Sequence, residues 1–377
     1  GVPADLSRSI PWPNDAWKTI LTVAASVLVL VGIGLGVYHL ISNRRQVLSD
    51  GELYNRYNHS VVMLRSVWHY NVSIGNQLTL DDLNTISKKL GLLNAGYYFP
   101  TKVILGRNEE KKTVPVLNAS GATSKEIVDF FNSFEGNIGL GTATGFFVSE
   151  NGQLVTNLHV VKPWLFGDEA KMLEEYKSEL TYKLGKFAEI LVANQYPLGL
   201  SAYISQLKVE GELDYITLIP QGEIFDLDNA VKCRVLSAGN DYQKDVALIQ
   251  TISKRLPVDC SYIKVKDSLD VSDEAIRVGE HVYTLGFPAG MNFQEGENEK
   301  GIQVYAQGGD ITRKDSEFEF SYNAATTGGA SGSPVFNKYG MLIGVHHGGY
   351  SQAGTHGYNF GIKAKYIKEL LDNPHEK

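Results

Sequence analysis

Cysteine and clustered positive charge are both scarce in this sequence. Only Cys233 and Cys260 are cysteines among the 377 residues, and neither belongs to a C-x-x-C pair. This excludes a disulfide-stapled scaffold and the cysteine-based zinc and redox motifs. Lys and Arg number 35 against 42 Asp and Glu, with a formal charge of −7 and no Lys/Arg-rich run. We therefore expect no nucleic-acid partner, because phosphate binding needs clustered positive charge.

Metal and nucleotide motifs are missing as well. None of the 9 histidines lies in an HExxH pattern, and the adjacent His346 and His347 would point to opposite faces of a strand, which suits one metal ion poorly. The glycine-rich run 139–145 has the wrong spacing for a dinucleotide-binding loop and precedes a strand-like segment. The sequence predicts neither a metal nor a cofactor.

One long uncharged run lies near the start of the chain. Residues 19–43 contain no Asp, Glu, Lys or Arg, and 20–41 are apolar over a length that, at about 1.5 Å per residue, crosses a bilayer core of ~30 Å. We predict an N-terminal flank over 1–19, a single transmembrane helix over 20–41 and a linker over 42–51. A cleaved signal peptide is the alternative, although this span is longer than the usual apolar region of such peptides.

Two features of this span concern its partners and orientation. Gly32 and Gly36 form a GxxxG pattern, which can pack two such helices and weakly indicates a homo-oligomer. The Lys and Arg residues on its two sides are too similar in number to orient it.

From residue 52 onward the sequence alternates strand-like and helical segments. Residues 60–66 have the β-branched, apolar content of a core strand. Strand-like segments flank Asn151-Gly152, which predicts a β-hairpin with a type I′ turn. Apolar residues repeat at helical spacing in 79–91, 123–134, 169–191 and 365–372.

Three segments of this region carry residues suited to nucleophilic catalysis. His159 follows a hairpin strand, Asp245 stands before a buried strand, and Ser331 lies in the glycine-rich turn TTGGASGSP. A serine hydroxyl is a poor nucleophile unless an imidazole takes its proton, and the imidazole needs a carboxylate to orient it. We predict a triad of these three residues, with the amides of Gly329 and Ser331 as an oxyanion hole.

The order of the triad along the chain discriminates between folds. α/β-Hydrolases run Ser, Asp, His and subtilisins run Asp, His, Ser, whereas His, Asp, Ser is the chymotrypsin order. We therefore predict an all-β fold, a double β-barrel of the chymotrypsin type over residues 52–373, preceded by the single transmembrane helix. Helical insertions are expected at about 75–138 and 163–230.

These segments resemble the trypsin/chymotrypsin-like serine peptidases, and the nucleophile region is similar to that of the bacterial glutamyl-endopeptidase branch. The similarity lies in YNAATTGGASGSPVFN over 322–337, IGVH over 343–346, TNLHVV around His159 and TLGFP over 284–288. It implies a serine endopeptidase that acts on polypeptides. With the transmembrane helix, it implies a single-pass membrane protein whose protease domain is extracytoplasmic.

The same resemblance places Thr326 and His346 in the primary specificity pocket, facing an acidic substrate residue. An imidazole and a hydroxyl can bind a carboxylate, and Ala325 stands where the trypsin-like pattern has an acid. If His346 is protonated in this role, the preference for Glu weakens as pH rises. Two alternatives remain open, a broad-specificity quality-control protease and a catalytically silent barrel used as a binding module.

Overall fold

The computed structural model describes residues 21–29, 46–119, 121–133, 141–224, 230–290, 301–314, 316–349 and 358–374. The chain divides into two units, Gly1–Val47 and Leu48–Lys377. In the first unit, residues 21–29 form an exposed helix. The rest of the predicted transmembrane span, including Gly32 and Gly36, lies outside the described residues. Among the helices described, none combines the length and apolarity that a bilayer crossing requires.

The second unit begins with a six-stranded antiparallel barrel. Its strands close in the order β1-β4-β5-β8-β7-β6, because β1 pairs with both β4 and β6. Their bounds are β1 Val61–Ser73, β4 Gly141–Phe147, β5 Gln153–Thr156, β6 Lys208–Pro220, β7 Val231–Ala238 and β8 Ala247–Thr251. The first part of β1 carries the β-branched run from which a strand was expected, and its side chains are fully buried.

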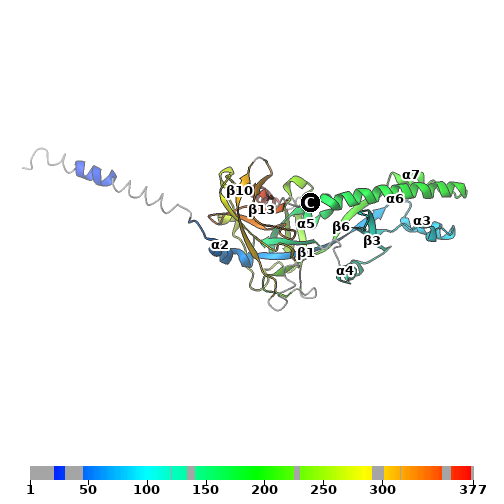
Figure 1. Ribbon diagram of the computed structural model, residues 1–377, viewed down its shortest axis with the longest axis horizontal. Coiled ribbons are helices and arrows are strands. Elements are labelled where there is room, and N and C mark those ends of the chain that lie inside the picture. The colour runs from blue at the N-terminus through cyan, green and yellow to red at the C-terminus, as the bar shows by residue number, and fades with distance from the viewer. Residues whose placement is uncertain are drawn as a thin grey trace, which may run out of the picture. The chain divides into compact units, whose positions relative to one another are not determined.

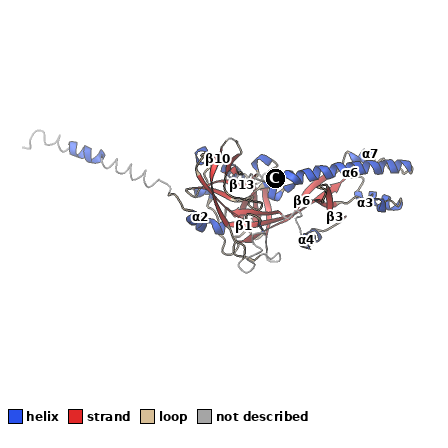
Figure 2. Ribbon diagram, viewed as in Figure 1, coloured by secondary structure: helices blue, strands red, loops and turns tan. Residues whose placement is uncertain are grey.

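A second closed barrel follows, with strand order β10-β11-β14-β13-β12-β9. Its strands are β9 His281–Gly286, β10 Tyr305–Arg313, β11 Glu319–Tyr322, β12 Pro334–Asn337, β13 Leu342–Gly349 and β14 Asn359–Lys363. Figure 2 shows the strands of both barrels in red beside the helices. The predicted double β-barrel is thus present, whereas the transmembrane helix is not among the described elements.

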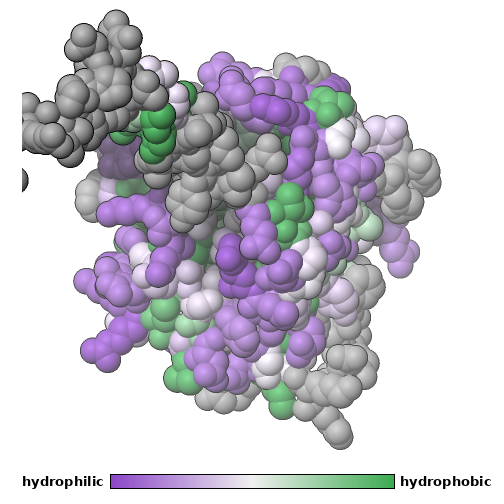
Figure 3. Space-filling model, turned by 90° about the vertical axis from the view of Figure 1, so that its left-hand side faces the viewer, coloured by the Kyte–Doolittle hydropathy of each residue, from purple (hydrophilic) through white to green (hydrophobic). Residues whose placement is uncertain are grey.

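One buried hydrophobic cluster is shared by the two barrels, and each barrel has a further cluster of its own. Phe146 and Leu248 of the first barrel belong to the same buried cluster as Leu285 and Phe336 of the second. Helix α2 (Asp50–Tyr57) closes one side, where its Tyr57 ring stacks on Phe336 at a centroid distance of 4.4 Å. Burial of this much apolar surface fixes the barrels against each other and so fixes any site between them. The face drawn in Figure 3 is mostly hydrophilic, with hydrophobic residues in small separate areas.

Strands β1 and β6 continue past the barrel and form the base of an arm. Beyond Ser66, β1 no longer pairs with β4 but stays paired with β6 as far as Ser73. Helix α6 (Gly167–Ala193) runs along this arm in Figure 1. The arm has its own buried cluster, which includes Leu83 and Leu184. Its other elements are α3 Leu80–Lys89, β2 Lys102–Arg107, β3 Thr113–Ala119, α4 Ser124–Ser133 and α7 Ser201–Ile204.

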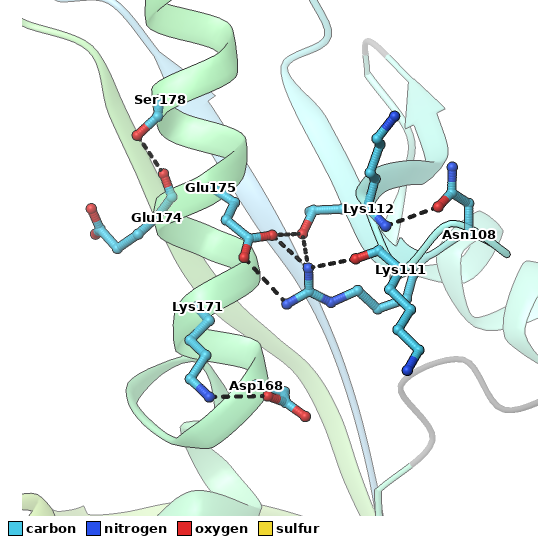
Figure 4. A network of polar contacts seen from close by, with 10 residues as sticks. Asn108, Lys111, Lys112, Asp168, Lys171, Glu174, Glu175 and Ser178 are labelled. Atoms are coloured by element: carbon cyan, nitrogen blue, oxygen red, sulfur yellow. Dashed lines mark hydrogen bonds and ion pairs between the residues drawn. The ribbon is translucent and has the colours of Figure 1, made fainter.

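A polar network ties α6 to the neighbouring hairpin. Glu175 of α6 accepts hydrogen bonds from Arg107 at the end of β2 and from Thr113 at the start of β3. Figure 4 shows Glu175 on α6 with the dashed lines of its polar contacts. These two bonds lower the pKa of Glu175 below its ordinary value. The network fixes the position of the helix along the arm, while the buried apolar face of α6 supplies most of the attachment.

The remaining helices are short or terminal. They are α5 Leu158–Val161, α8 Val265–Ser268 and α9 Ala364–Asp372, with 3₁₀ turns at Asn58–Ser60, Leu93–Ala95, Pro163–Leu165, Tyr242–Lys244 and Asp273–Ala275. The helical patterns of the sequence correspond to α3, α4, α6 and α9. Capping boxes start α3 at Thr79 and α4 at Thr123. The sequence predicted the start of α4 at this residue.

Two local predictions need correction. The hairpin at Asn151-Gly152 is present, but only Gly152 of this turn has a positive φ, +68°, so the turn is not type I′. Val148 N donates to Gln153 O at 2.8 Å, which makes a four-residue loop, and such loops are usually built on a type I turn. In addition, the range 163–230 expected as an insertion also contains β6, a strand of the first barrel.

Candidate active site

His159 is held by its position just after β5. It lies in the single-turn helix α5, whose other apolar residues are buried in the first barrel. The ring of His159 is hydrogen-bonded through Nδ1 to Asp245 Oδ2 at 2.8 Å, and its backbone N–H donates to Asp245 Oδ1 at 2.9 Å. One carboxylate therefore fixes both the backbone and the ring of this histidine. With Nδ1 donating to the carboxylate, Nε2 is free to accept a proton.

Asp245 is completely buried where the chain enters β8. Its backbone carbonyl accepts a hydrogen bond from Asn157 Nδ2 at 2.8 Å, which ties it to the segment just before His159. Burial alone would raise the pKa of Asp245. The charge of His159 and the hydrogen bonds from His159 and His347 outweigh burial and hold this pKa below its ordinary value. Asp245 is therefore ionised at neutral pH.

Ser331 lies in the tight turn before β12 and is half-buried. The turn depends on Gly329, whose φ of +94° is unfavourable for other residues and whose added Cβ would lie 2.4 Å from Phe287 O. Ser331 O accepts a hydrogen bond from Thr144 N at 2.8 Å, which ties the turn to the first barrel. Ser333, the other serine of the turn, is fully buried and cannot meet a substrate without rearrangement.

Some backbone amides of the turn donate hydrogen bonds within the described part of the protein and others do not. Those of Ala330, Gly332 and Ser333 donate to backbone carbonyls. Those of Gly329 and Ser331 have no partner among the described residues. They are the two amides that the sequence predicts as oxyanion-hole donors.

A pocket of about 180 Å³ adjoins Ser331 and His159, which both line it. The arm contributes one side, since Phe166 and Glu169 come from the start of α6, and the Phe166 ring lies 5.7 Å from the His159 ring. Burial raises the pKa of Glu169 above its ordinary value. Other lining residues are Ser66, Trp68, Thr142, Ala143, Val160 and Pro163.

His346 lies on β13 and Thr326 precedes the turn between β11 and β12, both in the second barrel. His346 is only 2% exposed, and the Tyr322 hydroxyl lies 2.6 Å from its Nδ1. Burial, with the charges of His347 and His159, lowers the pKa of His346 to about 3. The ring is therefore neutral. A neutral imidazole that accepts the hydrogen bond of the Tyr322 hydroxyl at Nδ1 carries its single N–H hydrogen on Nε2. Thr326 Oγ1 donates to Asn359 Oδ1.

This charge state corrects one expectation. A protonated His346 was expected to bind an acidic residue and to lose that ability as pH rises. With its pKa at about 3, His346 offers a neutral Nε2–H donor throughout the neutral range instead.

Sequence reasoning missed the neighbour of His346. His347 Nδ1 lies 3.0 Å from Asp245 Oδ2, and its Nε2 lies 3.2 Å from Glu319 Oε2. The pattern of two adjacent histidines on a strand predicted opposite faces, and it could not indicate that His347 meets Asp245. His159, Asp245 and His347 each offer one atom of a kind that could bind a metal ion, and these three atoms lie within 4.8 Å of one another. Both imidazoles direct Nδ1 at the same carboxylate oxygen, so the three groups satisfy each other by hydrogen bonds.

Comparison with known proteins identifies the family. The model of the trypsin-like peptidase domain matches residues 143–345, a range that contains His159, Asp245 and Ser331. The chain belongs to this family. The two barrels of this trypsin-like domain accordingly have the chymotrypsin arrangement.

Curated relatives of this trypsin-like chain are of two kinds. A probable periplasmic serine endoprotease, DegP-like, of Rhizobium meliloti is 26% identical over 231 residues, 61% of this chain and 32% of the relative. A glutamyl endopeptidase of Staphylococcus epidermidis is 34% identical over 110 residues, 29% of this chain and 34% of the relative. The chain spans about a third of the length of these relatives. A solved HtrA-type protease with a decapeptide is 14% identical, with a TM-score of 0.42 and coverage of 86% of this chain and 66% of that one.

Proposed function

We propose that this chain is a serine endopeptidase that hydrolyses peptide bonds with Ser331 as nucleophile, His159 as base and Asp245 as the residue that orients the base. The observation that carries the proposal is the double hydrogen bond from His159 to buried Asp245, beside a half-buried Ser331 on the same pocket. The relatives named as serine endoproteases and glutamyl endopeptidases support it.

In the proposed reaction Ser331 Oγ attacks the substrate carbonyl carbon while His159 Nε2 takes the hydroxyl proton. The oxygen that gains negative charge is bound by the amides of Gly329 and Ser331. His159 then gives the proton to the leaving amine, the peptide C–N bond breaks, and an ester to Ser331 remains. Water, activated by His159 in the same way, hydrolyses that ester and restores the hydroxyl. Asp245 stabilises the imidazolium at each step without being protonated itself.

A fluorophosphonate probe tests the triad, because it labels only a serine activated by a base. We expect Ser331→Ala and His159→Ala each to abolish labelling and peptide cleavage. Ser333→Ala is the matched control and should label normally, since this second serine of the turn is fully buried. Labelling of the Ser331→Ala protein would refute the assignment. A well-folded wild-type protein that is never labelled would favour the alternative of a silent barrel that binds peptides.

We further propose that the chain cleaves after acidic residues, with Thr326 and His346 in the specificity pocket. The neutral Nε2–H of His346 has no hydrogen-bond partner among the described residues and is suited to donate to a substrate carboxylate. A peptide library that varies only the residue before the scissile bond tests this. Faster cleavage after basic or large apolar residues than after Glu and Asp would reject the acidic pocket. It would favour the broad-specificity protease, which the DegP-like relatives make the second candidate.

We also propose that residues 20–41 anchor the chain in a membrane as a single pass, with the protease domain outside the cytoplasm. The uncharged run supports the anchor, and the relatives named as periplasmic support the side. The full chain should stay in the membrane pellet through high-salt and alkaline washing, whereas a chain lacking residues 1–45 should be soluble and labelled by the probe. Recovery of the full chain in the soluble fraction would reject the anchor. Gly32 and Gly36 make a homo-oligomer through this helix part of the same proposal.

A further inference from the structure

A second histidine contacts the carboxylate proposed to orient the catalytic base. Asp245 Oδ2 is 2.8 Å from His159 Nδ1 and 3.0 Å from His347 Nδ1. The other ring nitrogen of His347 is 3.2 Å from Glu319 Oε2. The side chains of Glu319, His347, Asp245 and His159 thus contact one another in this order, in one line of hydrogen bonds. The proposed reaction gives His347 and Glu319 no task.

The line crosses from one barrel to the other. Glu319 lies on β11 and His347 on β13, both of the second barrel, while Asp245 and His159 belong to the first. The register of β13 against β14 shifts between His346 and Gly348, so His347 stands at a β-bulge. Bulges redirect a side chain out of the regular alternation of a strand. The side chain of His347 at this bulge contacts Asp245 Oδ2, the oxygen that His159 of α5 also contacts.

The contacts fix the charge of His347. A neutral imidazole donates through one nitrogen only, so a ring that faces carboxylates with both nitrogens must carry both hydrogens. Burial alone would lower the pKa of His347. Hydrogen bonds to Asp245 and Glu319, and the charges of these carboxylates, instead raise the pKa to about 9. The other titratable groups facing it are His159, within 4.8 Å, and the neutral His346.

We propose that His347 is a positioning residue of the triad, whose imidazolium, held by Glu319, fixes the Asp245 carboxylate and offsets part of the negative charge that faces His159. The inference rests on the proposed function and deepens it. A negative charge favours the protonated form of a nearby imidazole. The positive charge of His347, which contacts the same carboxylate oxygen as His159, acts against this.

The pH dependence of kcat/KM tests the proposal, because its acid limb reports the protonation of His159 in the free enzyme. In His347→Gln the cation within 4.8 Å of His159 is lost, and we expect the acid limb to move up by about one pH unit. In Glu319→Gln an anion is lost while His347 keeps Asp245 as partner, so the limb should move to lower pH. A purely structural role would lower the rate in both variants without moving the limb.

His281→Gln is the matched control. His281 pairs with Asp310 at 2.8 Å on the second barrel and belongs to no part of the proposed site, so this variant should keep the wild-type limb. An unmoved limb in His347→Gln, or equal shifts in both site variants, would overturn the role of His347. If His347→Gln does not fold, an unmoved limb in Glu319→Gln overturns it. A wild-type protein that the fluorophosphonate probe does not label would instead refute the proposed function, and the two failures are therefore distinct.

Discussion

Removing the donor on His346 is a direct test of the proposed acidic pocket. His346→Leu alone would leave the buried Tyr322 hydroxyl without its acceptor, at a cost of about 1–3 kcal/mol. We therefore compare the double variant His346→Leu with Tyr322→Phe against Tyr322→Phe alone, in which the histidine is kept. The difference between these two proteins isolates the imidazole.

The expected magnitude follows from the kind of bond lost. A hydrogen bond to a charged group contributes about 1.5–3 kcal/mol, so its loss should reduce the ratio of kcat/KM for Glu and Gln substrates by about ten- to a hundredfold. The assay uses two peptides that differ only in that residue. Cleavage of the Gln peptide should change little, because the triad is intact.

The pH dependence of the same ratio distinguishes a neutral donor from a cation. The pKa of His346 is about 3, several units below neutral pH, and a bound carboxylate raises it only from that low starting value. The ring therefore stays neutral from pH 7 to 9 even with substrate bound, and the Glu/Gln ratio should be flat over this range. A ratio that falls about tenfold per pH unit would show proton uptake by His346 and refute this reasoning. A ratio unchanged by the Leu substitution would remove His346 from the pocket.

Three further predictions follow from particular contacts. Gly329→Ala should nearly abolish probe labelling while circular dichroism stays native, because a Cβ at φ +94° would lie 2.4 Å from Phe287 O and displace the turn. Leu184→Ala should destabilise the arm by about 2–5 kcal/mol in denaturant unfolding, since Leu184 is fully buried. Tyr182→Ala, on the exposed face of α6, should change the free energy of unfolding little. Equal effects of the two substitutions would contradict the packing of α6. The pKa of His347 is raised from about 6.5 in the unfolded chain to about 9 in the folded protein. Its contribution to the free energy of unfolding is therefore complete below pH 6.5 and is lost as pH rises through 9. His347→Gln should remove this fall of the unfolding free energy with pH, as measured by urea unfolding at several pH values.

Much of the site could be predicted from local sequence. Ser331, His159 and Asp245 each stand in a segment whose chemistry is readable without the fold, because a glycine-rich turn, a histidine after a strand and an acid before a buried strand are local patterns. Their order along the chain then selected the double barrel. Helices α3, α4 and α6 were predictable for the same reason, since helical periodicity and capping boxes involve residues at most a few positions apart.

The arm was only partly predictable. Its helices gave a clear periodic pattern, but β6 lies in a stretch that alternates weakly between buried and exposed residues along its outer half. That strand is defined by pairing with β1, more than a hundred residues earlier in the chain, and a pairing between such distant segments leaves no local mark.

The sequence by itself determined the family of the fold, the three residues proposed as the triad and the glycine on which their turn depends. The tertiary structure alone decided the charge states. His346 and His347 are neighbours of the same type in the chain, yet one is buried against a tyrosine and neutral while the other bridges two carboxylates and is a cation. A pKa depends on the burial and the charges that surround a group in space, and those are supplied by Tyr322, Asp245 and Glu319 only after the two barrels have packed together.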